Sequence, residues 1–270
     1  MRFLLSRRWL LFALAVAALA WLASQLGQWQ FHRLDERRAE NRTVAHNLAE
    51  PPVPIDDLLR VGAAPSAAHE WRKVVAHGTW DDAHTIVVKY QTRDSGAGVD
   101  VVTPLRTADG AAVLVDRGWM ASENVGSRRP KLPEAQSGHV TVIGWVRIDG
   151  TGGSTRVDDL ATRAISSRAA AKVLPYPLYG GFLDLQTESP APETRLGATE
   201  LPDDTSEGPH FFYGLQWWFF GVLAVFGFGY LAYDEWRRAR EEKGPGSGPG
   251  PGSERAEHAA VDGQHHARHE

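Results

Sequence analysis

Two long apolar stretches lie near the ends of the chain, and a polar segment separates them. Residues 9–26 carry no charge and as a helix would measure roughly 27 Å, enough to cross the hydrocarbon core of a bilayer. Residues 211–233 would measure roughly 35 Å and would cross it with some tilt. Both stretches carry Trp or Tyr near their ends, where amphipathic rings favour the headgroup zone. The pattern predicts two transmembrane helices around one hydrophilic segment.

Basic residues after the second apolar stretch predict the orientation of both spans. Four of them follow it closely, whereas residues 196–210 before it contain no Lys or Arg; the four are Arg237, Arg238, Arg240 and Lys243. The positive-inside rule then places the C-terminus, and with two spans also the N-terminus, in the cytoplasm. We therefore expect a cell-membrane protein with a cytoplasmic N-terminus (1–8), a first span (9–26), an extracytoplasmic domain (27–210), a second span (211–233) and a cytoplasmic tail (234–270).

A cleaved signal peptide is the alternative interpretation of the first apolar stretch. A basic start precedes it, and Ala18-Leu19-Ala20 has the small-x-small form of a cleavage site. The apolar run continues past that site through Trp21 and Leu22, which favours a retained anchor.

The segment between the spans has the pattern of a β-rich domain. Runs rich in Val, Ile and Thr predict strands at 71–80, 84–93, 99–106, 111–120 and 139–148. Asp109-Gly110 predicts a hairpin, since both turn positions favour positive φ. Residues 161–172 suggest a helix, and 172–187 a last strand whose prolines suit a sheet edge. The predicted fold is a mainly antiparallel, barrel- or sandwich-like β domain with a few helices.

Two further segments flank this domain. No helix breaker occurs before Pro51, so we expect the first helix to continue beyond the membrane, with a short helical turn at 55–60 to follow. From Gly244 the chain is rich in Gly and Pro and should form a disordered tail. The histidines of that tail lack the spacing of a metal site.

Composition excludes several classes of protein. The chain has no cysteine, which rules out disulfides, a thiolate nucleophile and Cys-ligated metals. A net charge of −4 argues against nucleic acid as a partner. No GxSxG, HExxH or phosphate-binding loop is present, so an enzyme is not expected.

The start of the second span carries a candidate ligand for a haem. One helical face there presents an imidazole, two aromatic rings and two glycines, in His210, Tyr213, Gly214, Trp217 and Gly221. A neutral imidazole binds haem iron well, and glycines leave room for a flat macrocycle. The first span has a comparable stripe of small residues, Ala13, Ala17, Ala20, Ser24 and Gly27. The alternative is that the two stripes pack together and that His210 is an interfacial or helix-capping residue.

Three motifs in this order around two spans carry a resemblance to a known family. They are Gly27-Gln28-Trp29-Gln30-Phe31-His32-Arg33, Val115-Asp116-Arg117-Gly118-Trp119 and Pro209-His210-Phe211-Phe212-Tyr213-Gly214-Leu215-Gln216-Trp217. Over residues ~7–237 the chain resembles the Surfeit locus protein 1 family, assembly factors for haem–copper cytochrome c oxidase. Its Gly/Pro tail and its Ala, Arg and Gly usage resemble an actinobacterial member.

The resemblance implies a role in assembly, namely helping haem a to enter subunit I of the oxidase. Haem a would be a transient cofactor, and subunit I, haem a synthase and the lipid bilayer would be partners. It makes His210 the axial ligand of the haem iron. The other motif positions are Trp29, Gln30, Arg33, Arg117, Gly118, Trp119, Tyr213, Gln216 and Trp217.

Further roles follow for some of these residues. Tyr213 and Trp217 are candidates to pack on the macrocycle, and Arg33 and Arg117 to reach its propionates. For each arginine the alternative is a local ion pair. We expect Gly118 to permit a bulge or close approach, and Trp119 to lie in the core. The rival function is a membrane scaffold that stabilises subunit I without binding haem.

Overall fold

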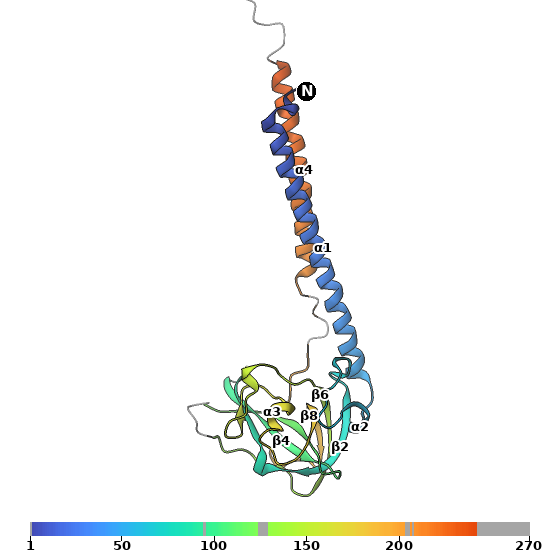
Figure 1. The fold of residues 1–270 in the computed structure, drawn as a ribbon, viewed down its shortest axis with the longest axis vertical. Coiled ribbons are helices and arrows are strands. Elements are labelled where there is room, and N and C mark those ends of the chain that lie inside the picture. Colours follow the sequence, from blue (N-terminus) through green and yellow to red (C-terminus); the bar gives the residue numbers. More distant parts are fainter. Residues whose placement is uncertain (1, 94–95, 124–128, 203–205, 207, 242–270) are drawn as a thin grey trace, which may run out of the picture. The chain divides into compact units, whose positions relative to one another are not determined.

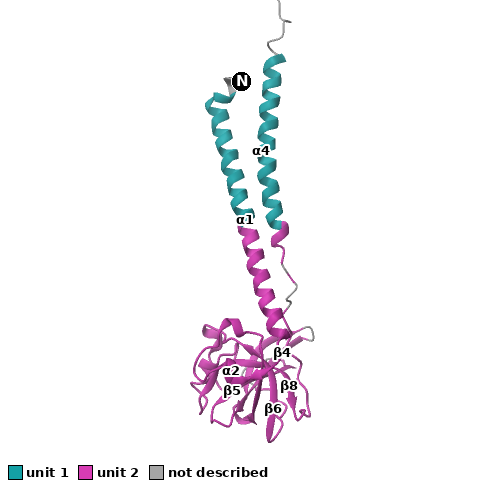
Figure 2. Ribbon diagram, turned by 90° about the vertical axis from the view of Figure 1, so that its right-hand side faces the viewer, with its two compact units in different colours: residues 1–28, 213–270 teal, residues 29–212 magenta. Residues whose placement is uncertain are grey.

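The computed structural model describes residues 2–93, 96–123, 129–202, 206 and 208–241. The chain divides into two compact units, residues 1–28 with 213–270, and residues 29–212 (Figure 2). The predicted tail from Gly244 and its histidines lie outside the described residues.

Two long helices contain the apolar stretches. After a 3₁₀ turn at Arg2–Leu5, helix α1 runs from Arg7 to Ala49, and helix α4 runs from His210 to Glu241. Their most apolar windows have mean hydropathies of 1.9 and 1.5 and are almost entirely unburied, so both helices are long and apolar enough to span a membrane. Helix α1 continues past its apolar stretch and ends just before Pro51-Pro52, as predicted.

In the first unit, α1 and α4 pack through small residues. A Cβ atom added to Gly27 would lie 2.2 Å from Cδ1 of Trp218 and 3.3 Å from the carbonyl oxygen of Gly214. A Cβ on Gly221 would lie 3.3 Å from that of Ala23. Such close backbone approach is typical of helix pairs in membranes. The two small-residue stripes therefore pack on each other, which was the alternative interpretation of the sequence.

The second unit contains an eight-stranded sheet (Figure 1). Its strands are β1 Val53–Pro54, β2 Lys73–Trp80, β3 Ile86–Arg93, β4 Gly96–Arg106, β5 Ala112–Ala121, β6 His139–Arg147, β7 Ala161–Thr162 and β8 Leu178–Ser189. They are ordered β1-β2-β6-β8-β5-β4-β3-β7, and an additional β2–β4 pairing closes β2, β6, β8, β5 and β4 into a ring. Short helical segments lie between strands, namely α2 Ile55–Leu58, α3 Ser167–Ala170 and 3₁₀ turns at Ala67–His69, Asp82–His84 and Gly153–Thr155.

The sheet buries apolar residues on both faces. One cluster fills the inside of the ring and includes Val74, Val115, Val142 and Leu183. A second cluster covers the other face of β3, β4, β5 and β8 and includes Leu114, Phe182 and Leu174. Because side chains alternate along a strand, Leu114 and Val115 point to opposite faces.

The sheet is mixed. The pairs β2–β6, β2–β4, β6–β8, β4–β5 and β3–β4 are antiparallel, whereas β5–β8 and the two-residue pairs β1–β2 and β3–β7 are parallel. The predicted hairpin between β4 and β5 is present, although only Gly110, with φ of 86°, adopts positive φ. Asp109 instead accepts hydrogen bonds from Thr107 and from the N–H of Ala111.

Two elements differ from the prediction. The helix expected at 161–172 is a two-residue strand, β7, followed by the short helix α3, because Ser166 caps the N–H of Ala169 and starts the helix late. The edge strand expected at 172–187 is β8, which lies inside the sheet between β6 and β5. Pro175 and Pro177 precede its first residue, so they remove no hydrogen bond from the sheet.

Candidate functional site

His210 is the first residue of α4, and Gln30 on α1 fixes the orientation of its ring. The Nδ1 atom of His210 lies 2.9 Å from Oε1 of Gln30, and both residues belong to the second unit. An amide oxygen only accepts hydrogen bonds, so this contact favours the tautomer in which Nδ1 carries the proton and donates it. In that tautomer Nε2 carries the free lone pair that a metal requires.

Two more contacts hold the same segment against α1 within this unit. The rings of Phe31 and Phe211 meet edge to face with centroids 6.2 Å apart. The side-chain amide of Asn41 donates to the backbone oxygen of Ser206 over 3.0 Å. The Gln30–His210 hydrogen bond is therefore supported by an aromatic contact and a second hydrogen bond between the two segments.

The surroundings of His210 suit one axial ligand to a haem iron. Gly208 lies beside the ring, with φ of 68°, and a Cβ there would sit 3.3 Å from Cδ2 and 3.6 Å from Nε2. A side chain at position 208 would therefore touch the Cδ2–Nε2 edge of the ring, which glycine avoids. Metal-binding histidines usually donate their other N–H to an oxygen, as His210 does. Within the described residues no three His, Asp or Glu side chains gather as a bare-metal site.

The neighbouring motif residues have separate positions. Arg33 forms an ion pair with Glu36 over 3.0 Å, with 57% of its side chain exposed, and Trp29 is exposed. Tyr213, Gln216 and Trp217 follow on α4 but belong to the other unit. Of the predicted site residues, the structure thus brings Gln30 and His210 into direct contact.

Arg117 is deeply buried in the sheet body. Only 2% of its side chain is exposed, and the guanidinium donates to the backbone oxygens of Pro133 and Glu134. It also lies 3.8 Å from a carboxylate oxygen of Asp82 and 5.6 Å from the ring centre of Trp80. Arg117 therefore makes local contacts within the β body. A local ion pair was the alternative to a contact with a haem propionate.

Gly118 and Trp119 support the fold around β5. Gly118 has φ of 124°, and a Cβ there would lie 2.3 Å from the carbonyl oxygen of Gly197. Trp119 and Gly197 exchange backbone hydrogen bonds of 2.9 and 2.7 Å. The indole N–H of Trp119 donates to the oxygen of Gln91 over 3.0 Å. The expected close approach at Gly118 is confirmed. The expectation that Trp119 lies in the core is wrong, because its side chain is only half-buried and belongs to neither apolar cluster.

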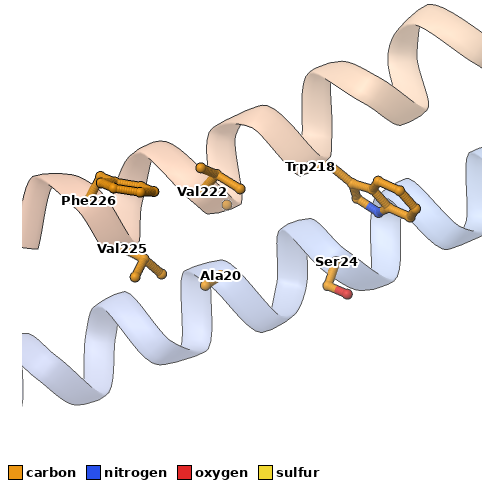
Figure 3. A pocket seen from close by; sticks show the side chains of 7 residues that line it. Ala20, Ser24, Trp218, Val222, Val225 and Phe226 are labelled. Atoms are coloured by element: carbon orange, nitrogen blue, oxygen red, sulfur yellow. The ribbon is translucent and has the colours of Figure 1, made fainter.

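An apolar groove lies between α1 and α4 in the first unit (Figure 3). It has a volume of about 360 Å³ and is lined by Ala20, Ser24, Trp218, Gly221, Val222, Val225 and Phe226. Trp218, which the sequence did not single out, covers the backbone at Gly27. The sequence could not reveal this contact, because it depends on the rotation of α4 about its axis.

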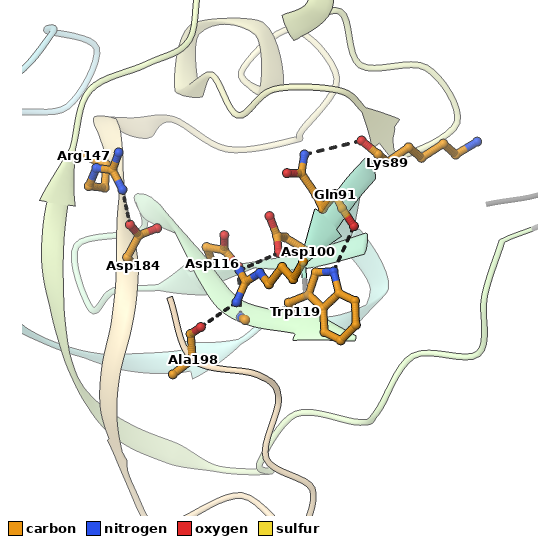
Figure 4. Close-up of polar contacts among 10 residues, drawn as sticks. Lys89, Gln91, Asp100, Asp116, Trp119, Arg147, Asp184 and Ala198 are labelled. Carbon is orange, nitrogen blue, oxygen red and sulfur yellow. Dashed lines mark hydrogen bonds and ion pairs between the residues drawn. The ribbon is translucent and has the colours of Figure 1, made fainter. Parts of the chain in front are cut away.

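A group of charged side chains on the outer face of the sheet was not predicted from the sequence. They are Arg93, Asp100, Arg147 and Asp184, together with Asp116, which was noted only as part of a motif (Figure 4). The available signal was an aspartate inside each of three apolar strand patterns, Val99-Asp100-Val101, Val115-Asp116-Arg117 and Leu183-Asp184-Leu185.

These features define a class of protein, with two helices apolar enough to span a membrane and a mixed β body encoded between them. The SURF1 family model matches residues 17–222, and the chain belongs to this family. The family is generally linked to cytochrome oxidase assembly, and its members are not known enzymes.

Relatives of the chain include actinobacterial proteins, as the sequence suggested. Uncharacterized SURF1-like proteins of Mycobacterium bovis and Mycobacterium tuberculosis are each 32% identical over 249 residues, which cover 89% of both chains. A SURF1-like protein of Dictyostelium discoideum is 26% identical over 106 residues, 37% of this chain and 39% of the relative. Membership of the family therefore rests on most of the chain.

Proposed function

We propose that this protein assists the insertion of haem a into subunit I of a haem–copper cytochrome c oxidase, with Nε2 of His210 as an axial ligand. The hydrogen bond from Nδ1 of His210 to Gln30 carries the proposal, because it leaves Nε2 unprotonated and holds the ring in place. Membership of an oxidase-assembly family supports the same role.

The chemistry of the cargo favours this position along the chain. Haem a is hydrophobic and carries a long isoprenoid tail, so a carrier should hold it at or within the bilayer. His210 stands directly before the apolar stretch of α4. Haem a is thus the substrate of this step, and subunit I, haem a synthase and the bilayer are its partners.

The proposed topology has both termini in the cytoplasm and residues 27–210 outside the cell membrane. The basic residues after α4, set against a preceding segment without Lys or Arg, support it. Reporter fusions at each terminus and inside the β body test it. A terminus that is accessible from outside the cell would contradict it. A β body that is protected from a probe added outside the cell would also contradict it.

The central experiment measures bound haem. The protein is co-expressed with the enzymes of haem a biosynthesis, purified in detergent and examined by optical spectroscopy. We expect haem a in the wild type and its loss in His210→Ala. His46→Ala is the matched control, since His46 lies on α1 and is exposed beside Glu50.

Two outcomes would reject the carrier role. A wild type that never retains haem a, but still co-purifies with subunit I, would establish the scaffold function instead. Equal haem a content in His210→Ala and wild type would remove His210 from the site.

A further inference from the structure

Five charged side chains lie across five neighbouring strands on the outer face of the sheet. In the strand order β6-β8-β5-β4-β3 they are Arg147, Asp184, Asp116, Asp100 and Arg93, which we call the charged row (Figure 4). Asp116 and Asp184 are direct partners in the β5–β8 ladder. Both point to the same face as Leu114 and Phe182, since side chains alternate along each strand. The row therefore contains three carboxylates and two guanidinium groups.

The two arginines form ion pairs with the two outer carboxylates of the row. Arg147 forms an ion pair with Asp184, lies 3.3 Å from Glu70 and stacks 3.9 Å from the ring centre of Trp71. Arg93 pairs with Asp100 over 3.1 Å and also donates to the backbone oxygen of Ala198. Both guanidinium groups therefore form their ion pairs with the outer carboxylates, and Arg93 acts on the central Asp116 only from a longer distance.

Asp116 is the member of the row without a counter-ion. Its exposed fraction is 5%, and one of its oxygens accepts the N–H of Gly118 over 2.9 Å. It forms no ion pair with any side chain that the structure describes. Burial raises the pKa of Asp116 well above its ordinary value, and the nearby Asp100 and Asp184 raise it further, whereas the N–H of Gly118 and the more distant charge of Arg93 oppose this rise to a smaller extent. A buried carboxylate in this position requires a proton or a cation.

A cavity of about 480 Å³ opens directly over the charged row. Its lining contains four carboxylates and three guanidinium groups, and Phe182 supplies an apolar wall. The carboxylates are those of Asp100, Asp116, Asp184 and Glu200, and the guanidinium groups those of Arg93, Arg147 and Arg163. This volume holds a side chain with its charged head, which a site for a proton alone does not need.

We propose that this cavity binds a guanidinium group, the arginine side chain of a partner polypeptide, with Asp116 as its main counter-ion. A planar guanidinium has five N–H donors and pairs with carboxylates in a fork, so it matches several acceptor oxygens at once. It also loses less hydration than an ammonium group when it is buried. This inference is independent of the proposed handling of haem.

Arg163 of the same chain is the competing occupant. It is exposed at the rim of the cavity, and its guanidinium lies 5.2 Å from the ring centre of Tyr90. It forms no ion pair with the described carboxylates. In this position it forms no ion pair with Asp116, so the cavity remains available to an incoming group.

The test uses the full chain in detergent micelles at pH 7.5. Nα-acetyl-arginine N-methylamide is titrated calorimetrically, with the citrulline analogue as an uncharged probe of nearly the same shape. We expect saturable binding of the arginine probe and at least tenfold weaker binding of the citrulline probe. Asp116→Asn should weaken the arginine probe at least tenfold, whereas Asp57→Asn, an exposed carboxylate on α2, should leave it unchanged.

Other results would overturn the proposal. Equal affinity in Asp116→Asn and wild type would show that Asp116 does not hold the cation. Absence of binding in both wild type and Arg163→Gln would mean that the row retains only a proton. Binding seen in Arg163→Gln alone would identify Arg163 as the native occupant. Binding of free arginine as tight as the blocked probe would favour a small molecule over a polypeptide.

Discussion

Nδ1 of His210 and Oε1 of Gln30 lie 2.9 Å apart although 180 positions separate the two residues. This hydrogen bond selects the tautomer of His210, and it therefore makes a prediction that needs no haem. In Gln30→Ala the preference for the Nδ1–H tautomer should be lost, and in Gln30→Glu, which keeps an oxygen acceptor, it should remain. Nitrogen-15 NMR of labelled histidine measures the tautomer directly.

The same variants should change the amount of haem a that the protein retains, and the larger the loss of the Nδ1–H tautomer, the less haem a should remain. Loss of a partner that orients a ligand commonly weakens metal binding by about 10- to 100-fold, so Gln30→Ala should retain much less haem a than wild type. Gln28→Ala, an exposed neighbour on α1, is the control. If the tautomer of His210 changes but the haem a content does not, Gln30 sets the tautomer without controlling the binding of haem a.

The charged row predicts a pH-dependent stability. The pKa of Asp116 is raised above its ordinary value of 3.8, so the folded protein holds this proton more tightly than the unfolded chain. Its contribution to stability is complete below pH 3.8 and is lost as the pH rises through the folded pKa. In the absence of a cationic ligand, Asp116→Asn should therefore be more stable than wild type at pH 7.5, by about 1–3 kcal/mol.

Thermal unfolding of the β body across pH 3 to 8 checks this prediction. The difference between Asp116→Asn and wild type should shrink to zero at the acid end, where the wild-type side chain is neutral. Asp57→Asn should follow the wild type at every pH. A destabilised Asp116→Asn at pH 7.5 would mean that the charged form of Asp116 supports the fold.

Two glycines with positive φ make a matched pair for a test of stability. Gly118 and Gly110 have φ of 124° and 86°, but only Gly118 has a neighbour in the way, the carbonyl oxygen of Gly197 at 2.3 Å from a Cβ. Gly110→Ala should cost about 1 kcal/mol from backbone strain alone. Gly118→Ala adds a steric clash and should cost several kcal/mol, of the order that overpacking produces. Similar melting temperatures for the two variants would contradict this.

The sequence predicted those parts of the fold that depend on local pattern. The apolar stretches, the proline end of α1 and the Asp109-Gly110 hairpin follow from residues close together in the chain. The position of β8 did not, because the parallel β5–β8 pairing joins segments far apart in sequence. The prolines before Leu178 suggested an edge only because the start of the strand was placed too early.

The same distinction applies to the site. His210 was identified from its place at the start of an apolar helix, and Gln30 from its motif, but their contact requires the folded chain. Asp100, Asp116 and Asp184 each look like an isolated charge in a strand, and only the strand order brings them together. Contacts across a sheet depend on pairing and register, which residue spacing does not specify.

The packing of α1 on α4 predicts a specific cross-link. The chain has no native cysteine, so any disulfide within it must form between the two introduced cysteines. A Cβ at position 221 lies 3.3 Å from that of Ala23, close to the separation of a disulfide. Ala23→Cys with Gly221→Cys should therefore cross-link in native membranes on mild oxidation. Ala23→Cys with Gly227→Cys should not, since Gly227 has no neighbour within 4 Å.

A third substitution tests whether Gly27 permits this approach. Gly27→Val would place its Cβ 2.2 Å from Trp218, so the helices must separate and the cross-linked fraction should fall several-fold. Gly229→Val, where the structure leaves open space, should keep the full yield. Undiminished cross-linking in Gly27→Val would show that α1 and α4 meet through a different face, and the groove beside Trp218 would then lose its structural basis.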